Sequence, residues 1–369
     1  MKQGWEIKKL GEVCKIQTGK LDANAKEDDG MYPFFTCDAK PYRINTFAFD
    51  DEAILISGNG SLVGHVNYYN GKFNAYQRTY VLTKFTSYHL PFLISYLKGF
   101  LRSYIIENKK GGCIPYITLP ILQNFTIPCP PIAEQEKIVA ELDCLSGIIE
   151  KKKQQLKELD NLAQSIFYEM FGDPVENDKG WEVKKLGEVC DIINGFAFKS
   201  PLFVKEGDLI LRISNIQDGY VDIEDIAHFN KVDYPKVDFE RYAVHPNDIV
   251  VALSGATTGK LGINKTGKKL YLNQRVAICR EKDEVLHRTY LLYYLMRQSA
   301  SFLETAAGVA QPNLSTEQMK NYTMGIPPKN IQQHFAFKIE SIEKQKELIA
   351  QSIKETETLF NSRMDYYFN

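Results

Sequence analysis

The longest regular pattern of apolar and polar residues in this 369-residue chain occupies two stretches, one near the middle and one at the end. Apolar residues recur there at alternating steps of four and three, the heptad spacing of a helix with one buried face. The first stripe is Ile138, Leu142, Leu145, Ile149, Lys152, Leu156, Leu159, Ala163, Ile166 and Met170. Adding 197 gives the second stripe, Phe335, Ile339, Ile342, Lys346, Ile349, Ile353, Thr356, Phe360, Arg363 and Tyr367. The pattern predicts two long helices, at 132–172 and 329–369.

Helices of this length need a partner for their apolar stripes. The 38 residues at 134–171 would span about 57 Å, which is longer than a small domain is wide. Leaving the apolar positions of one stripe in water would forgo on the order of 10 kcal/mol or more. We therefore predict two long antiparallel coiled-coil helices with a globular domain at each end. In the alternative, each helix packs on its own domain.

The remaining sequence predicts two α+β domains, at 1–131 and 173–328. Short apolar runs bounded by Gly and Asn, at 53–56 and 248–253, are typical of strands, and 91–106 and 289–305 are typical of helices. Pro130-Pro131 and Pro327-Pro328 mark the end of each domain, because proline is tolerated only in the first turn of a helix.

An internal repeat relates the two halves. The segment GWEIKKLGEVC at 4–14 returns as GWEVKKLGEVC at 180–190, with ten of eleven residues identical, at an offset of 176. Later matches are offset by 197 and include Ser57-Gly58 with Ser254-Gly255, Gln77-Arg78 with Gln274-Arg275, and Gln135 with Gln332. The second copy thus has 21 more residues, which we place between Cys190 and Ser254. The prediction is one unit of domain plus helix, repeated about a pseudo-twofold axis, with a first domain that is smaller or lacks a loop.

Composition narrows the class of protein. The 45 Lys and Arg residues nearly balance the 46 Asp and Glu residues, for a net charge of −1, so any polyanion must bind to local patches rather than to bulk charge. The seven Cys residues are odd in number and form no C-x-x-C pair, which excludes a zinc knuckle and favours buried thiols of a cytosolic protein. Without a signal peptide or an apolar run of membrane length, a cytoplasmic location is predicted.

Motifs for catalysis are incomplete. The segment SGATTGKL at 254–261 has three residues between its glycines and Leu after the Lys, whereas a phosphate loop needs four residues and then Ser or Thr. Gly58-Asn59-Gly60 is interpreted as a turn. The six His residues lack metal-ligand spacing. We expect no catalytic residues, no metal and no cofactor.

Two matching windows, 57–78 and 254–275, contain no Asp or Glu, although the average composition would place between five and six acids in these 44 residues. Basic and aromatic residues beside Gly-rich and Asn-rich loops suit contacts with phosphates and base edges. A solvated loop would have the same composition, and Gly111 after Lys109-Lys110 also fits a helix C-cap. The predicted DNA contacts are Lys72, Gln77, Arg78, Lys109 and Lys110 in the first domain, and Thr257, Thr258, Lys260, Lys265, Lys268, Lys269, Gln274 and Arg275 in the second.

The repeated GWE[I/V]KKLGEV opening, the G-x-x-x-P segments at 111–115 and 308–312, and the two Pro-Pro-x-x-x-Gln helix starts resemble the specificity subunit of type I restriction-modification systems. The resemblance covers the whole chain. It implies two target recognition domains and two conserved spacer helices, without catalytic activity. It also implies double-stranded DNA, two modification (adenine methyltransferase) subunits and, through them, restriction (translocase and endonuclease) subunits as partners.

The main hypothesis is therefore a DNA-sequence reader of an asymmetric, bipartite target, with one domain for each half-site and the helix pair setting the gap. Two alternatives stay open, an antiparallel coiled-coil adaptor that binds proteins at its ends and a methyltransferase that acts alone. The sequence does not identify the target bases, because readout depends on which side chains face the groove.

Overall fold

The computed structural model describes residues 4–108, 116–282, 284–306 and 313–368. It divides into two compact units, Met1–Gln154 with Ala350–Asn369 (unit 1) and Gln155–Ile349 (unit 2). Each unit combines one globular part with half of each long helix. Both globular parts mix helices and sheets, as the α+β prediction requires. The division into segments 1–131, 132–172, 173–328 and 329–369 stays a prediction.

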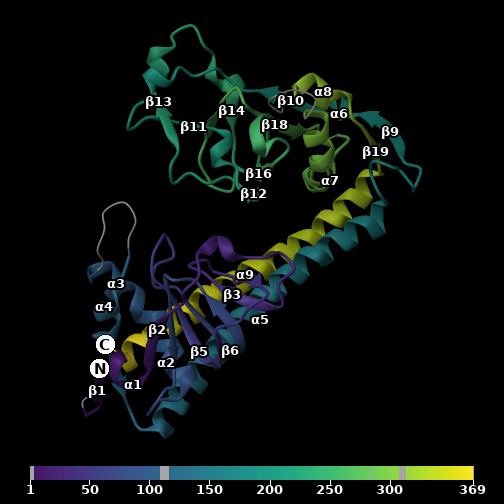
Figure 1. Ribbon diagram of the computed structural model, residues 1–369. Coiled ribbons are helices and arrows are strands. Elements are labelled where there is room, and N and C mark those ends of the chain that lie inside the picture. The colour runs from purple at the N-terminus through teal and green to yellow at the C-terminus, as the bar shows by residue number, and fades with distance from the viewer. Residues whose placement is uncertain (1–3, 109–115, 283, 307–312, 369) are drawn as a thin grey trace. The chain divides into compact units, whose positions relative to one another are not determined.

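Unit 1 is built on one six-stranded sheet (Figure 1). Only the β3–β6 pair is parallel, and all other neighbours are antiparallel. The strand order is β2 (Lys15–Thr18), β7 (Thr79–Thr83), β5 (Phe49–Ser57), β6 (Val66–Ala75), β3 (Tyr32–Phe35) and β4 (Tyr42–Ile44). One face of the sheet packs on α2 (Leu90–Tyr96), the π-helical turn η2 (Leu97–Leu101) and α3 (Arg102–Asn108), which together fill the predicted helix at 91–106.

Unit 2 repeats this order in two smaller sheets. The first is β10 (Cys190–Asn194), β18 (Val276–Glu281), β15 (Ile249–Ala252), β16 (Leu261–Ile263) and β12 (Gly219–Tyr220). The second is β13 (Ala227–Phe229), β11 (Asp208–Leu211), β17 (Leu270–Leu272) and β14 (Ala243–Val244). A single helix, α7 (Arg288–Ala306), covers the first sheet and confirms the helix predicted at 289–305.

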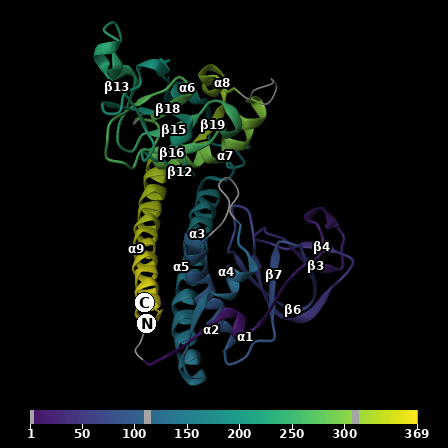
Figure 2. The ribbon, with the colours of Figure 1, turned by 60° about the vertical axis from the view of Figure 1, so that its left-hand side comes forward.

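The sheet divides in unit 2 because both strands of its central hairpin are interrupted. The segment between β14 and β15 contains Pro246, which cannot donate a ladder hydrogen bond, followed by Asn247 with a φ of 70°. Its partner is broken by residues 264–269 between β16 and β17. In unit 1, β5 and β6 run without a break and stay paired from Phe49 to Ile56. Figure 2 shows β6, β7, β3 and β4 of that sheet from another side.

The repeated GWE segments form the same strand and short helix in the two units. In unit 1, β1 (Glu6–Lys9) pairs with β8 (Thr126–Cys129) and leads into the short helix α1 (Leu10–Val13). In unit 2, β9 (Glu182–Lys185) pairs with β19 (Thr323–Ile326) and leads into α6 (Leu186–Val189). In each copy the Glu carboxylate of the short helix accepts a hydrogen bond from the backbone N–H three residues earlier, at 2.9 and 3.3 Å. This local cap explains the Lys-Lys-Leu-Gly-Glu spacing.

The two long helices are α5 (Ile132–Phe171) and α9 (Lys329–Phe368). The fourth residue of each is a glutamine, Gln135 or Gln332, whose side chain is fully buried. Each amide donates to the carbonyl of the first Pro of its Pro-Pro pair at 2.8 Å and accepts from the N–H of His89 or His287, at 2.8 and 2.7 Å. The Pro-Pro-x-x-x-Gln motif thus attaches the helix start to the neighbouring helix of the domain.

All twenty predicted stripe positions are buried or half-buried. In unit 1, Arg363 pairs with Glu141 (3.0 Å), and the ammonium of Lys152 donates to the Ser352 hydroxyl (2.5 Å). Partner numbers rise along one helix as they fall along the other, so the helix segments of this unit are antiparallel. In unit 2, Lys346 pairs with Asp160 at 2.7 Å, and the Phe167 and Phe335 rings are 5.6 Å apart, which gives the same direction.

The two predictions for the stripes are both correct in part. Ile138 and Leu142 of α5 pack in the core of the first domain together with Tyr367 and Phe368 of α9. Each unit therefore buries segments of both helices against its own domain and against each other.

Phe335 tests how far the domain core of unit 2 depends on α9. Its side chain is fully buried against Phe167, Phe171 and Tyr293. Phe335→Ala should destabilise unit 2 by about 3–5 kcal/mol, measured as a shift of its denaturant unfolding transition. Phe337, two residues later, is 72% exposed, and Phe337→Ala should change stability by less than about 0.5 kcal/mol. Equal effects of the two substitutions would contradict this assignment.

Candidate nucleic-acid interface

A tight turn joins β6 to β7 in unit 1 and carries Gln77 and Arg78. The N–H of Thr79 donates to the carbonyl of Tyr76 at 2.8 Å, which closes the turn. Three further backbone hydrogen bonds tie the turn to its neighbours: Tyr76 to Phe35 (2.9 Å), Gln77 to Leu21 (2.9 Å) and Gly58 to Arg78 (2.8 Å). The backbone is thus fixed, while the side chains of Gln77 and Arg78 are exposed.

Unit 2 has the same turn before β18, with Gln274 and Arg275 exposed. Its four hydrogen bonds correspond one to one: Val276 to Asn273 (2.9 Å), Asn273 to Leu211 (3.0 Å), Gln274 to Phe196 (2.9 Å) and Leu253 to Arg275 (2.9 Å). The predicted match of the Gln-Arg pairs is therefore confirmed in three dimensions.

In each unit a glycine, Gly19 after β2 or Gly195 after β10, lies very close to the backbone of the turn. A Cβ on Gly19 would lie 1.8 Å from the carbonyl oxygen of Ala75, and one on Gly195 would lie 2.1 Å from that of Asn273. Real Cβ atoms do not approach backbone oxygen this closely, so only glycine fits. The sequence pattern did not identify either residue as part of the site.

Beside each turn lies a loop with two left-handed glycines, Gly60 and Gly64 in unit 1 (φ 84° and 83°) and Gly255 and Gly259 in unit 2 (φ 79° and 83°). Positive φ is nearly free for glycine and costly for other residues. In both units the second glycine packs on the helix of the domain. The G-x-x-x-G spacing is visible in both copies and could have revealed these loops.

These loops correspond at an offset of 195, so the predicted match of Ser57-Gly58 with Ser254-Gly255 is wrong. Ser57 pairs with Thr79, and Ala252 pairs with Val276. Because Thr79 and Val276 follow the Gln-Arg turn at the same place in the two units, Ser57 corresponds to Ala252. The 21 additional residues are therefore split. Nineteen of them lie between β11 and β15: unit 2 has 37 residues there (212–248), whereas unit 1 has 18 (36–53). The other two lie between β16 and β17, where unit 2 has seven residues (264–270) and unit 1 has five (69–73).

The new alignment defines the tip of each loop as Ser61-Leu62 in unit 1 and Ala256-Thr257 in unit 2. The first residue of each tip is exposed and the second is half-buried. Thr258, a predicted DNA contact, occupies the place of the buried Val63. It is itself 5% exposed, and its hydroxyl donates to the carbonyl of Gly255 at 2.7 Å. Thr258 therefore shapes the loop.

Three of the predicted lysines in unit 2 have acidic partners from outside their acid-free window. Lys260 pairs with Asp218 (3.2 Å), Lys265 with Glu343 (3.4 Å) and Lys269 with Glu240 (2.5 Å). The hydrogen bond to Glu240 raises the pKa of Lys269. The window is acid-free along the sequence but not in space. Lys268 is exposed, and no ion pair is described for it.

In unit 1, Lys72 lies on β6 with its ammonium 4.7 Å from the centre of the Phe47 ring. It is exposed, and its cross-strand neighbour is Asp50. Lys109 and Lys110 lie outside the described residues. The structure thus brings together Gln77, Arg78 and the glycine loop, while Lys72 belongs to the adjoining hairpin.

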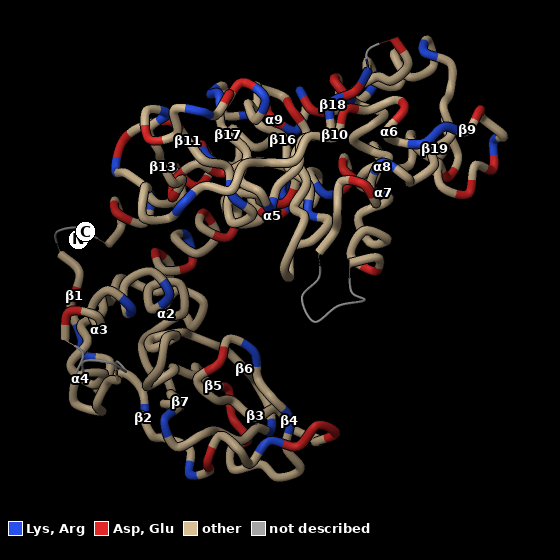
Figure 3. Tube along the Cα trace, turned by 90° about the horizontal axis from the view of Figure 1, so that it is seen from above, with Lys and Arg blue, Asp and Glu red and all other residues tan. Residues whose placement is uncertain are grey.

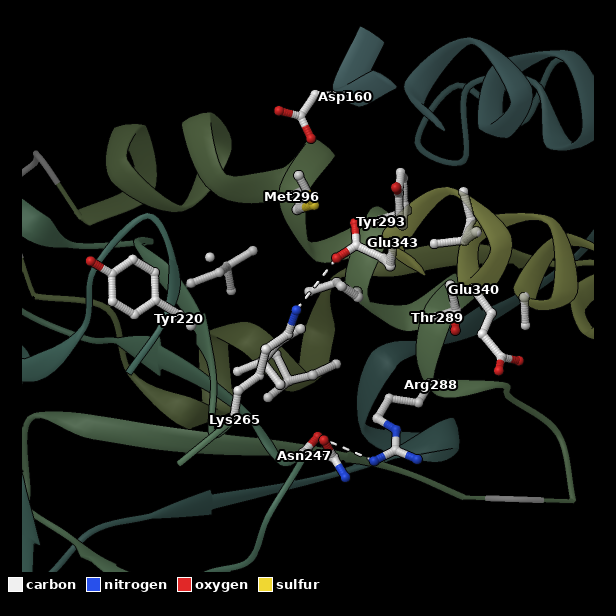
Figure 4. Close-up of a pocket in the computed structure, with 18 of the residues that line it drawn as sticks. Asp160, Tyr220, Asn247, Lys265, Arg288, Thr289, Tyr293, Met296, Glu340 and Glu343 are labelled. Carbon is white, nitrogen blue, oxygen red and sulfur yellow. Dashed lines mark hydrogen bonds and ion pairs between the residues drawn. The ribbon is translucent and has the colours of Figure 1, made fainter. Parts of the chain in front are cut away.

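Lys265 instead faces an open crevice of about 1340 Å³ between the second domain and the helix segments of unit 2. Figure 4 shows its ammonium directed at Glu343 of α9, and Arg288 beside Asn247. Because Lys260, Lys265 and Lys346 in this lining are all paired with carboxylates, the crevice lacks the excess positive charge that a polyanion requires.

Positive and negative residues alternate over both units (Figure 3). Within the described residues no group of three or more His, Cys, Asp or Glu is placed to hold a metal ion. The expectation of buried thiols is confirmed for Cys14, Cys190 and Cys279 and wrong for the exposed Cys144. No helix in the described part of the chain is long and apolar enough to cross a membrane.

Comparison with known proteins gives a consistent result. Residues 2–161 and 178–358 each match the family model of the type I restriction modification DNA specificity domain. The chain is 42% identical over 160 residues to the EcoDI specificity subunit of Escherichia coli, covering 43% of this chain and 35% of that one. It is 27% identical to the MjaVIII specificity subunit of Methanocaldococcus jannaschii, covering 92% and 86%. The chain thus spans only part of the EcoDI subunit but most of the MjaVIII subunit.

Solved structures support the fold. The crystal structure of a type I restriction-modification S subunit from M. genitalium covers 99% of this chain and 97% of its own, with a TM-score of 0.58 and 14% identity. A chain of a type I restriction-modification system gives a TM-score of 0.63 at 18% identity, with the same coverage. The chain therefore shares its fold with these two structures.

Gly19 provides a direct test of the turn scaffold. Gly19→Ala would place a methyl group against the Ala75 carbonyl, and such overpacking should destabilise unit 1 by about 1–3 kcal/mol, measured by denaturant unfolding. Gly147 in α5 has no atom within 4 Å of an added Cβ. Gly147→Ala should therefore stabilise unit 1, by roughly 0.5–1 kcal/mol. A stable Gly19→Ala protein would show that the close approach is not required.

Proposed function

The chain belongs to the family of type I restriction-modification DNA specificity domains, and from this premise we propose that it is the non-catalytic, DNA-reading subunit of such a complex. The observation that carries the proposal is the repeated surface of the two units. Each combines an exposed Gln-Arg turn with a glycine loop whose tip differs between the units. A fixed scaffold with variable side chains suits readers of two different half-sites.

The proposed target is bipartite and asymmetric, in double-stranded DNA inside the cell. Unit 1 would contact one half-site through Gln77, Arg78 and Lys72, and also through Lys109 and Lys110, which lie outside the described residues. Unit 2 would contact the other half-site through its loop and turn. The proposed residues there are Thr257, Lys260, Lys268, Lys269, Gln274 and Arg275, with Thr258 shaping the loop and Lys265 at the helix-facing side.

The two long helices would act as an antiparallel coiled-coil spacer that sets the distance between the readers. The buried stripes and the pairs Glu141–Arg363 and Asp160–Lys346 support this role. The subunit would recruit two modification subunits and, through them, the restriction subunits. Those partners would bind the methyl donor and the nucleotide. They would also make many of the contacts with the DNA phosphates, because this chain has a net charge of −1.

A selection experiment tests the proposed function. The full chain, assembled with its modification subunits, is mixed with random duplexes, and the retained DNA is sequenced. We expect two conserved half-sites separated by a fixed gap. Retention without sequence preference would support a protein-binding adaptor instead. Methyl transfer by the purified chain alone would support an independent methyltransferase.

The spacer role predicts the effect of longer helices. Seven residues inserted after Gln154 in α5, together with seven after Ile349 in α9, lengthen both helices at the chain positions that divide the two units. Because a heptad preserves the buried face, the preferred gap should change while both half-sites stay the same, as read from the same selection. An insertion in α5 alone breaks the pairing and serves as the control. Altered half-sites in the double insertion would show that the helices help to shape the readers.

A further inference from the structure

The two units differ at most exposed positions of the candidate interface but share Gln77-Arg78 and Gln274-Arg275 on the same turn. Shared glycines in this region are explained by their positive φ or by close contacts. The Gln and Arg side chains are exposed, so packing does not explain why both copies retain them.

Hydrogen bonding within the chain does not explain this identity either. The amide of Gln77 donates to Asp22 at 2.7 Å, but Asp22 corresponds in unit 2 to Ala197, the residue after Phe196, whose side chain has no hydrogen-bond acceptor. No side-chain partner is described for Arg78, Gln274 or Arg275. The four hydrogen bonds that hold the turn in each unit are made by the backbone. They require no particular side chain at these positions.

The common requirement must therefore lie outside the chain, in something that both units contact. Two half-sites of an asymmetric target differ in their bases but share the sugar-phosphate backbone. Arginine presents a planar fork of donors that matches phosphate oxygens, and a glutamine amide can donate beside it.

We propose that the Gln-Arg turn is a base-independent phosphate anchor, present once in each unit, and that the loop tips Ser61-Leu62 and Ala256-Thr257 discriminate bases. The anchor lies directly beside the loop, because the Arg carbonyl accepts a hydrogen bond from the residue just before each loop, Gly58 or Leu253. A phosphate held by the turn fixes where the loop tip meets the groove. This inference rests on the proposed DNA-reading function.

The test uses the full chain with its modification subunits and two duplexes, the selected target and the same duplex with the second half-site scrambled. Arg275→Ala should weaken binding of both duplexes by the same factor, about tenfold or more. It should also reduce the slope of log affinity against log salt concentration by about 0.9, the value for one phosphate. Arg275→Lys should retain the slope, and Gln274→Ala should weaken both duplexes without changing it.

Two further variants make the result specific. Lys236, an exposed lysine elsewhere in unit 2, should leave both affinity and slope unchanged when replaced by Ala. Thr257→Leu, which introduces the tip residue of unit 1, should leave the slope unchanged and alter the preference among second half-sites. An unchanged slope in Arg275→Ala, or weakening confined to the selected target, would overturn the phosphate anchor. A parent complex that does not distinguish the two duplexes would instead refute the proposed function.

Discussion

The apolar stripes of α5 and α9 are the constraint on which the rest of the structure depends. A 40-residue helix with a continuous buried face is unstable unless every turn of that face is covered. The domains cover the ends of the stripes, where Phe167, Phe171 and Phe335 join one core and Tyr367 and Phe368 join the other. Neither globular part has a complete core without segments from both long helices, so each domain is attached to these helices by buried side chains.

This attachment to the helices explains how the two units can differ in their loops and yet keep the same fold. The attachment points are nearly invariant between the copies: the GWE strand, the buried glutamine at each helix start and the glycine beneath the turn. Between them, the hairpin is continuous in unit 1 and split by Pro246 in unit 2. Within the additional residues, β12 extends the edge of one sheet, and Tyr234 and Phe239 are buried in a cluster separate from the core that contains the helix residues. A duplicated scaffold of this kind can change one loop without disturbing the other reader.

Much of this architecture could be predicted from the sequence, because heptad spacing and a ten-of-eleven repeat are strong signals. The predictions were correct for the two long helices, for the shorter helices of the domains and for the equivalence of the Gln-Arg pairs. The alignment of Ser57-Gly58 with Ser254-Gly255 was wrong because an identical dipeptide does not by itself establish structural equivalence, whereas strand pairing fixes the register to one residue. The partners of Lys260, Lys265 and Lys269 could not be found, because Asp218, Glu343 and Glu240 are distant in sequence and are brought near only by folding.

Those ion pairs change how the near-neutral charge is interpreted. A lysine held by a carboxylate must lose that partner before it can bind a phosphate, so its net contribution to DNA affinity is smaller than its charge implies. The exposed arginine of each turn has no such competitor described and sits on a backbone that is already fixed. Little backbone entropy therefore remains to be lost there on binding. In a chain whose charges largely neutralise one another, a few exposed cations on equivalent, fixed turns would determine where the duplex lies in the proposed complex, while the neighbouring loops would determine which sequence is accepted.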